Sequence, residues 1–283
     1  MFRHLLLLLA VAGGSAFAQK NTENRWSAIR TPNLATPQAI GGYANGCQMG
    51  AQTLAESGDG YVSIRRFRNR YYAQPVTLAL IDRVSDAMAA QGRRILIGDL
   101  SQPIGGEMPY GHASHQSGLD VDFWFATVDS RERPRADIDK VDPPSMVDKA
   151  AGIMAPGRWR SEYRDALHAA ATFAGTSRIF VNPVIKQHLC VTESDRRWLQ
   201  KVRPWGGHDA HFHVRLHCPP DSPFCEAQKA LPPGDGCDAD LQNWIRDQSD
   251  AILNPKPPKP AKPKAPKIPP AACEALLGAS FQQ

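Results

Sequence analysis

Residues 111–125 read GHASHQSGLDVDFWF, and this stretch decides the fold because it joins a pair of histidines to an alternating segment. From Leu119 onward apolar residues occupy every second position, which is the period of a strand with one buried face. Asp120, Asp122 and Trp124 therefore share the opposite face of that strand. The pattern predicts a strand that packs one side into the core and presents two carboxylates on the other.

A second stretch, residues 207–216, reads GHDAHFHVRL and has the same alternation. Its apolar side chains alternate with polar ones, so His211 and His213 point to one side of a predicted strand. Together with His115 and Asp122, His213 would complete a set of two imidazoles and one carboxylate. Such a set suits Zn²⁺ and leaves a coordination position open to water. The residues alone therefore favour a zinc hydrolase.

The first residues have the pattern of a secretory signal peptide. A short polar start precedes an apolar run over residues 5–11, and the small-x-small pattern of residues 16–18 fits a cleavage site. This run is too short to span a bilayer core of about 30 Å. The alternative is an anchor that is never cut. We expect residues 1–18 to be removed and the mature chain to be exported.

Charge and cysteine content narrow the class further. The formal net charge of +5 is modest and part of it lies in one tail, so it does not indicate a nucleic-acid partner. The six cysteines fit three disulfides in an exported chain. Without a C-x-x-C motif, neither a thiolate zinc site nor a thioredoxin-like site is suggested, and fifteen pairings are possible. Cys218 and Cys225 flank a Pro-rich turn, which makes a local bridge between them the simplest pairing.

Helical and strand patterns alternate irregularly along the rest of the chain. We therefore expect an α+β fold with a central antiparallel sheet that carries both motifs. Residues 21–60 and 130–144 are expected to be mainly loops, apart from short pieces. The expected helices cover residues 77–91, 161–173, a segment that begins at 182–183, and 194–202. The expected strands outside the motifs cover residues 61–64, 94–98 and 178–181.

The character of the chain changes near its end, because residues 254–270 interleave proline with lysine. Such a segment is an extended linker of the polyproline type. It is either a plain spacer or an adhesive contact with an anionic polymer. We divide the chain into a signal peptide (1–18), a catalytic domain with the predicted zinc site (19–253), this linker, and a tail (271–283) that Cys273 can tie back to the body.

The two motifs resemble those of the penicillin-insensitive murein endopeptidases, peptidase family M74. These belong to a wider group of zinc peptidases, called LAS, that includes lysostaphin-type enzymes, D-Ala-D-Ala carboxypeptidases and the hedgehog fold. The resemblance covers most of the mature chain but not the Pro/Lys linker. It implies a disulfide-bonded, hedgehog/DD-peptidase-like fold. It also implies a periplasmic metalloendopeptidase that uses metal-activated water to cut D-alanyl–meso-diaminopimelyl cross-links in peptidoglycan, insensitive to penicillin.

Residue roles also follow from the resemblance. It implies that the zinc is held by His115, Asp122 and His213, with His112 also at the metal. It implies His211 as the general base, with His208 close by. We interpret Asp120, which shares a face with Asp122, as a residue that supports the ligands. The disulfides that the resemblance implies are Cys47–Cys273, Cys190–Cys237 and Cys218–Cys225.

Some departures and alternatives remain open. A second metal position in this family would need an aspartate and a histidine three residues apart. Three residues after Asp148, however, the chain has Ala151 instead of a histidine. One alternative is a non-catalytic module that binds the cell wall. Loss of His208 or His211 would indicate such a module, but both are present. The other is a zinc amidase such as a carboxypeptidase that removes terminal D-Ala. We expect peptidoglycan as the substrate and no membrane segment after signal cleavage.

Overall fold

The computed structural model describes residues 23–133, 136–257 and 267–282. The predicted signal peptide (1–18) and the middle of the predicted linker lie outside these residues. Among the described helices, none is both long and apolar enough to cross a bilayer.

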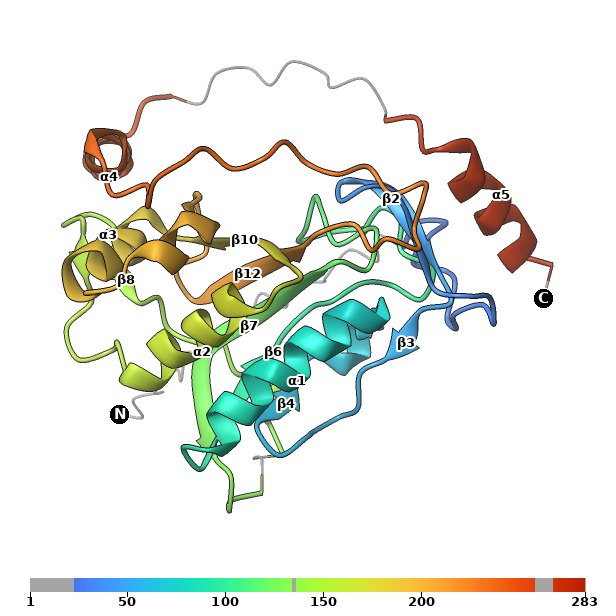
Figure 1. The fold of residues 1–283 in the computed structure, drawn as a ribbon, viewed down its shortest axis with the longest axis horizontal. Coiled ribbons are helices and arrows are strands. Elements are labelled where there is room, and N and C mark those ends of the chain that lie inside the picture. Colours follow the sequence, from blue (N-terminus) through green and yellow to red (C-terminus); the bar gives the residue numbers. More distant parts are fainter. Residues whose placement is uncertain (1–22, 134–135, 258–266, 283) are drawn as a thin grey trace, which may run out of the picture.

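One six-stranded sheet organises the molecule, in the order β11-β10-β12-β7-β6-β4 (Figure 1). Its four central strands are antiparallel neighbours, whereas β4 lies parallel to β6 and β11 lies parallel to β10. The strands are β4 (Tyr61–Ser63), β6 (Arg93–Ile97), β7 (Asp120–Asp129), β10 (Thr176–Val181), β11 (Val202–Pro204) and β12 (His211–Leu216).

The sheet is therefore mixed, and the prediction of an antiparallel sheet was wrong for both outer pairs. The physical reason lies in their connections. Helix α1 (Pro75–Ala89) links β4 to β6, and α3 (Pro183–Thr192) lies between β10 and β11. A crossover through a helix returns the chain in the same direction, which yields parallel neighbours. The α+β class itself is confirmed.

The buried face of the sheet is the apolar side of the two motif strands. Phe123 opposes Phe212 and Val121 opposes Val214 across β7 and β12, and all four side chains are fully buried. The two phenylalanine rings stack with centroids 5.1 Å apart. Helices α1 and α2 (Ser161–Thr172) lie across this face (Figure 1) and bury their apolar residues in the same core. Every second residue of each motif strand therefore remains on the other face.

Local sequence explains where the helices begin. Pro75 and Pro183 each occupy the first turn of a helix, where the missing N–H is not needed. The side chain of Asn182 accepts a hydrogen bond from the Val184 N–H at 3.0 Å and caps α3. The expected helix over 194–202 is a short 3₁₀ segment instead, Arg197–Lys201. Two helices were not predicted at all, namely α4 (Ala239–Leu253) and α5 (Ala271–Ser280).

The N-terminal region contains more regular structure than its composition indicates. Strands β1 (Gln38–Gly42) and β2 (Asn45–Met49) form a hairpin. Trp26, Ile104 and Leu277 pack with the hairpin and α5 in a second small core. The other short elements are β3 (Gln52–Thr53), β5 (Tyr72–Ala73), β8 (Val147–Asp148), β9 (Ile153–Met154), and the 3₁₀ segments Arg66–Arg68 and Ile138–Lys140.

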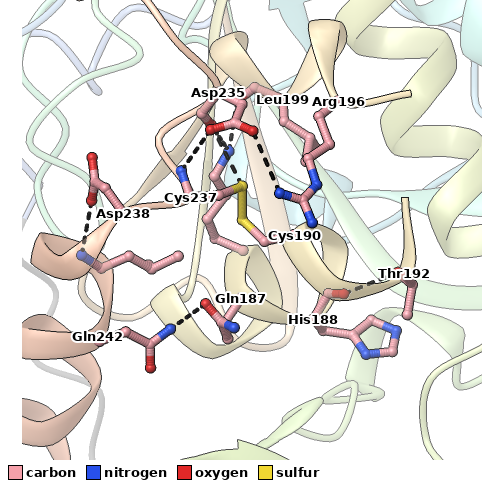
Figure 2. Close-up of a disulfide and its surroundings, with 12 residues drawn as sticks. Gln187, His188, Cys190, Thr192, Arg196, Leu199, Asp235, Cys237, Asp238 and Gln242 are labelled. Atoms are coloured by element: carbon pink, nitrogen blue, oxygen red, sulfur yellow. Dashed lines mark hydrogen bonds and ion pairs between the residues drawn. A yellow bond between two sulfur atoms is a disulfide. The ribbon is translucent and has the colours of Figure 1, made fainter. Parts of the chain in front are cut away.

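All six cysteines are paired, in the three pairings that the family resemblance implied. Cys47–Cys273 fastens α5 to β2. Its sequence separation is 226 residues, and a loop of that length stabilises the fold by about 5 kcal/mol in the chain-entropy model. Cys190–Cys237 joins α3 to the segment that leads into α4 (Figure 2). The two long-range bridges therefore fasten α5 to the β1–β2 hairpin and the segment before α4 to α3.

Candidate metal centre

The polar faces of the two motif strands meet at the middle of the sheet. Strand β7 pairs with β12 so that Asp122 lies opposite His213, and Asp120 lies opposite Arg215. The next polar position on β12, His211, lies opposite Trp124. Because side chains directly opposite one another across two strands share a face, the carboxylate and imidazoles of the two motifs converge.

His115 reaches the same point from the loop before β7. Its backbone is left-handed, with φ of +66°, which is uncommon outside glycine. Its N–H donates to Asp120 Oδ2 at 2.9 Å, and its ring Nδ1 lies 2.8 Å from the Leu100 carbonyl oxygen. These contacts hold the strained backbone in place and turn Nε2 of the fully buried ring toward Asp122.

Three ligand-type atoms lie at nearly equal separations. His115 Nε2 is 3.2 Å from His213 Nδ1 and 3.4 Å from Asp122 Oδ1, while His213 Nδ1 is 3.3 Å from the same carboxylate oxygen. A tetrahedral zinc ion with bonds of about 2.0–2.1 Å holds its ligand atoms about 3.3–3.4 Å apart. The spacing of His115, Asp122 and His213 therefore fits zinc.

The hydrogen-bond roles make the fit chemical as well as geometric. A carbonyl can only accept, so His115 Nδ1 carries a hydrogen, and Asp120 likewise requires one on His213 Nε2. In neutral rings the facing nitrogens then carry lone pairs. Asp122 Oδ1 is buried and has no hydrogen-bond partner among the described residues. A buried acceptor without a donor is costly, so the arrangement of the three atoms favours a bound cation.

The charge of the site depends on Asp120. Burial alone would raise the pKa of this carboxyl group, but Arg215 and His213 outweigh it and hold the pKa well below its usual range. Burial lowers the pKa of His213, whereas Asp120 and Asp122 raise it by more. The pKa of His213 in the metal-free site therefore lies above that of an ordinary histidine, and a bound cation would compete with a proton for this ring.

His112 lies beside this set but is already engaged. Its ligand atom lies within 4.8 Å of those of His115 and Asp122. Nε2 of His112, however, is 3.0 Å from Asp99 Oδ2, and it is 3.5 Å from Asp122 Oδ2. An ionised carboxylate only accepts, so this nitrogen donates to Asp99. The structure thus places His112 at the edge of the cluster, and its Nε2 is hydrogen-bonded to Asp99.

Asp99 is the neighbour that the sequence did not reveal. It is buried two residues after β6 and accepts from Arg70 Nη1 at 2.8 Å and Arg68 Nη1 at 3.1 Å. Burial would raise its pKa, but His112 and the two arginines hold it well below the usual range. The signal available in the sequence was its place directly after the strand predicted over residues 94–98.

His211 and His208 form a more open pair next to the three-residue set. His211 Nε2 is 3.8 Å from Asp122 Oδ1, and its side chain is 26% exposed. The two rings have centroids 5.0 Å apart. Burial lowers the pKa of both imidazoles, that of His208 to about 4. Both are therefore neutral at pH 7 and able to accept a proton.

Trp124 forms one wall beside His211, with ring centroids 6.3 Å apart. The position depends on Gly98, because a Cβ there would lie only 2.3 Å from Trp124 Nε1. The Arg65 guanidinium carbon lies 4.2 Å from the centroid of the same indole. Such a cation–π contact holds the indole in place. The structure thus brings together the five histidines and the two aspartates, Asp120 and Asp122, that the sequence indicates.

Comparison with known proteins identifies the class and then the family. Residues 39–278 match the family described as penicillin-insensitive murein endopeptidase, which places the chain among the peptide hydrolases. The penicillin-insensitive murein endopeptidase of Yersinia enterocolitica is 42% identical over 258 residues, covering 90% of this chain and 91% of the relative. That of Salmonella paratyphi C is 43% identical over 256 residues, covering 89% and 90%. The chain belongs to peptidase family M74, as its motifs predicted.

Proposed function

We propose that this protein is a zinc-dependent murein endopeptidase that hydrolyses D-alanyl–meso-diaminopimelyl cross-links in the periplasm. One observation carries the zinc assignment: two imidazole nitrogens and the buried Asp122 Oδ1 face one another at 3.2–3.4 Å, and this oxygen has no hydrogen-bond partner among the described residues. Membership of the murein endopeptidase family carries the substrate class. The choice of the D-alanyl–meso-diaminopimelyl cross-link is taken from the family resemblance.

The roles of the side chains follow from their positions. His115, Asp122 and His213 would hold the ion, which would act as a Lewis acid and activate water for attack on a peptide carbonyl. His211, neutral and partly exposed beside Asp122, would accept the proton from that water and return one to the leaving amine. His208 would help to hold the substrate or the proton beside His211. His112 would stand next to the ion through its contact with Asp99.

Insensitivity to penicillin follows from the same chemistry. β-Lactams trap a serine nucleophile, typically in an S-x-x-K motif with a later K-T-G. The chain contains neither motif. Attack by water forms no acyl-enzyme that penicillin could trap, so activity would survive the drug.

The assignments of fold group and chain organisation complete the proposal. The mixed sheet with the motif residues on one face supports a hedgehog/DD-peptidase-like fold. The domain limits remain those inferred from the sequence, with a peptidase domain over 19–253 followed by the Pro/Lys linker. Export by a signal peptide over residues 1–18 agrees with a substrate that lies outside the cytoplasm.

Digestion of purified cross-linked dimeric muropeptides tests the proposal. The zinc-loaded protein is expected to convert dimers into monomers, equally well with and without penicillin, and to lose this activity in a chelator. Mass spectrometry distinguishes the products. Dimers that persist with zinc-loaded, folded protein would exclude the endopeptidase, and release of free D-Ala would identify a carboxypeptidase instead.

A further inference from the structure

Asn182 stands between the end of β10 and the start of α3, and its side chain is fully buried. The side-chain oxygen caps α3 by accepting a hydrogen bond from the Val184 N–H. Capping uses this oxygen alone, and a serine, threonine or aspartate would supply one equally well. The amide nitrogen of Asn182 is therefore not explained by the helix that the residue caps.

This amide nitrogen is directed at the loop that carries His208. Asn182 Nδ2 donates to the Gly207 carbonyl at 3.3 Å and to Gln248 Oε1 of α4 at 3.0 Å. The backbone N–H of Asn182 also donates to the His208 carbonyl at 2.9 Å. Among the described residues, no other group from outside the loop is hydrogen-bonded to the carbonyls of residues 206–208. One buried residue thus fixes the middle of this loop.

The loop needs such a support because its own sequence does not fix its conformation. Gly206 and Gly207 precede His208, and a Cβ at either glycine would meet no atom within 4 Å. Close packing therefore does not restrain this part of the loop, and glycine leaves the backbone conformationally free. His208 itself has a φ of +51°, in the left-handed region that is uncommon outside glycine. A contact from outside the loop has to hold His208 in this conformation.

The same arrangement occurs twice in the site. The left-handed backbone of His115 is held by the buried carboxylate of Asp120, and that of His208 is held by the buried Asn182. In the second case the result is a defined place for the His208 ring, whose centroid lies 5.0 Å from that of His211. The backbone strain at each histidine is thus balanced by one buried polar side chain.

We propose that Asn182 is a positioning residue for peptide hydrolysis, because it holds His208 beside His211 and so maintains the imidazole pair next to the metal centre. The inference rests on the proposed function, in which His211 accepts a proton and His208 acts beside it. Groups that handle a proton or a substrate lose effectiveness when they move by about 1 Å. None of the three proposed metal ligands is hydrogen-bonded to Asn182, so zinc binding should not depend on it.

Asn182→Ser tests this role, because serine retains an oxygen that can cap α3 but lacks the amide group that reaches the loop. With zinc-loaded protein and the cross-linked dimer as substrate, we expect kcat to fall by about 10- to 100-fold. Zinc affinity, measured by competition with a chelator, should stay that of wild type. The decisive measurement is a double-mutant cycle with His208→Ala. In the His208→Ala protein, Asn182→Ser should lower kcat by less than about twofold, because the residue that it positions is absent.

The backbone N–H of residue 182 provides a readout without catalysis, because it donates to the His208 carbonyl. Its hydrogen exchange in the metal-free protein, followed by NMR, should be about five- to tenfold faster in Asn182→Ser, the scale of one lost hydrogen bond. Asp238→Ser is the matched control, since Asp238 caps α4 by accepting from the Leu241 N–H. This control should change neither kcat nor the exchange rate at residue 182.

Equal losses of kcat from Asn182→Ser with and without His208 would overturn the proposal, because they would show a general structural role. An unchanged kcat, an unchanged exchange rate or a lowered zinc affinity in Asn182→Ser would overturn it as well. If the serine variant does not fold, Asn182→Asp replaces it, because its carboxylate has the same shape and caps α3 but cannot donate to the Gly207 carbonyl. Cleavage of the dimer by wild type is scored first. Its absence would refute the endopeptidase, whereas the exchange rate would still decide whether Asn182 holds the loop.

Discussion

Asp120 Oδ1 lies 2.8 Å from His213 Nε2, and this contact determines which nitrogen of the imidazole faces Asp122. The same oxygen accepts from Arg215 Nε at 2.7 Å, while Asp120 Oδ2 accepts from the His115 N–H. One buried carboxylate therefore orients two of the three residues that would hold the metal. Supports of this kind fix the tautomer and the direction of a ligand.

The first prediction concerns this support. Asp120→Asn should lower zinc affinity by about 10- to 100-fold, because the loss of charge weakens the orientation and basicity of His213. Competition with a chromophoric chelator measures the affinity, and Asp86→Asn on the exposed side of α1 is the charge control. Unchanged affinity in Asp120→Asn would show that the contact does not tune the metal.

The second prediction concerns the three ligands themselves. His115→Ala, Asp122→Ala and His213→Ala should each lose tightly bound zinc, because a site with three protein ligands cannot spare one. Metal analysis after extensive dialysis measures the content, with circular dichroism to confirm folding. Stoichiometric zinc in all three folded variants would refute the ligand assignment.

The third prediction separates the base from the ligands. His211→Ala should retain zinc but lose turnover by about two to four orders of magnitude, which is the usual contribution of a positioned general base. Its Nε2 is 3.8 Å from Asp122 Oδ1, whereas the two facing nitrogens are within 3.4 Å. Loss of zinc in this variant and retention in His213→Ala would reverse the two roles.

The fourth prediction concerns Lys186, which is fully buried near Cys190–Cys237. Its Nζ donates to the carbonyls of Leu199 and Asp235, both drawn in Figure 2. Burial lowers the pKa of this amine to about 7, whereas an unfolded lysine has a pKa of about 10.4. Between these values the unfolded chain binds more protons, so the free energy of unfolding rises with pH.

A single titrating group can raise the free energy of unfolding by at most about 1.4 kcal/mol per pH unit. Lys186→Met lacks the amine. The free energy of unfolding of wild type, minus that of the variant, should therefore increase between about pH 7.5 and about pH 9.5. Urea unfolding of the metal-free proteins with intact disulfides measures the difference. A difference that stays constant over this range would contradict the lowered pKa.

The parts of the site that the sequence predicted are those with a local signal. Alternation with a period of two places Asp122 and His213 on the polar faces of their strands wherever those strands lie. The register that sets Asp122 opposite His213 is a long-range property, and the sequence carries no direct record of it. The Leu100 carbonyl that orients His115 is likewise invisible, because any residue could supply it.

The missed elements have equally specific causes. Helix α4 buries only Leu241 and Ile245, so its apolar pattern is too sparse to distinguish it from a loop. Strands β1 and β2 contain three glycines, which are depleted in strands and favour turns. Their hairpin is stabilised from outside by α5 and the Cys47–Cys273 bridge. In each case tertiary contacts outweigh weak local preference.

Zinc titration of the metal-free protein, followed on the cross-linked dimer, tests the central assignment most directly. If the ion held by His115, Asp122 and His213 is the catalytic one, activity should be absent without metal. It should then rise in proportion to added zinc and stop at a single equivalent per chain. Cleavage of the dimer by protein that analysis shows to be free of metal would contradict the zinc centre.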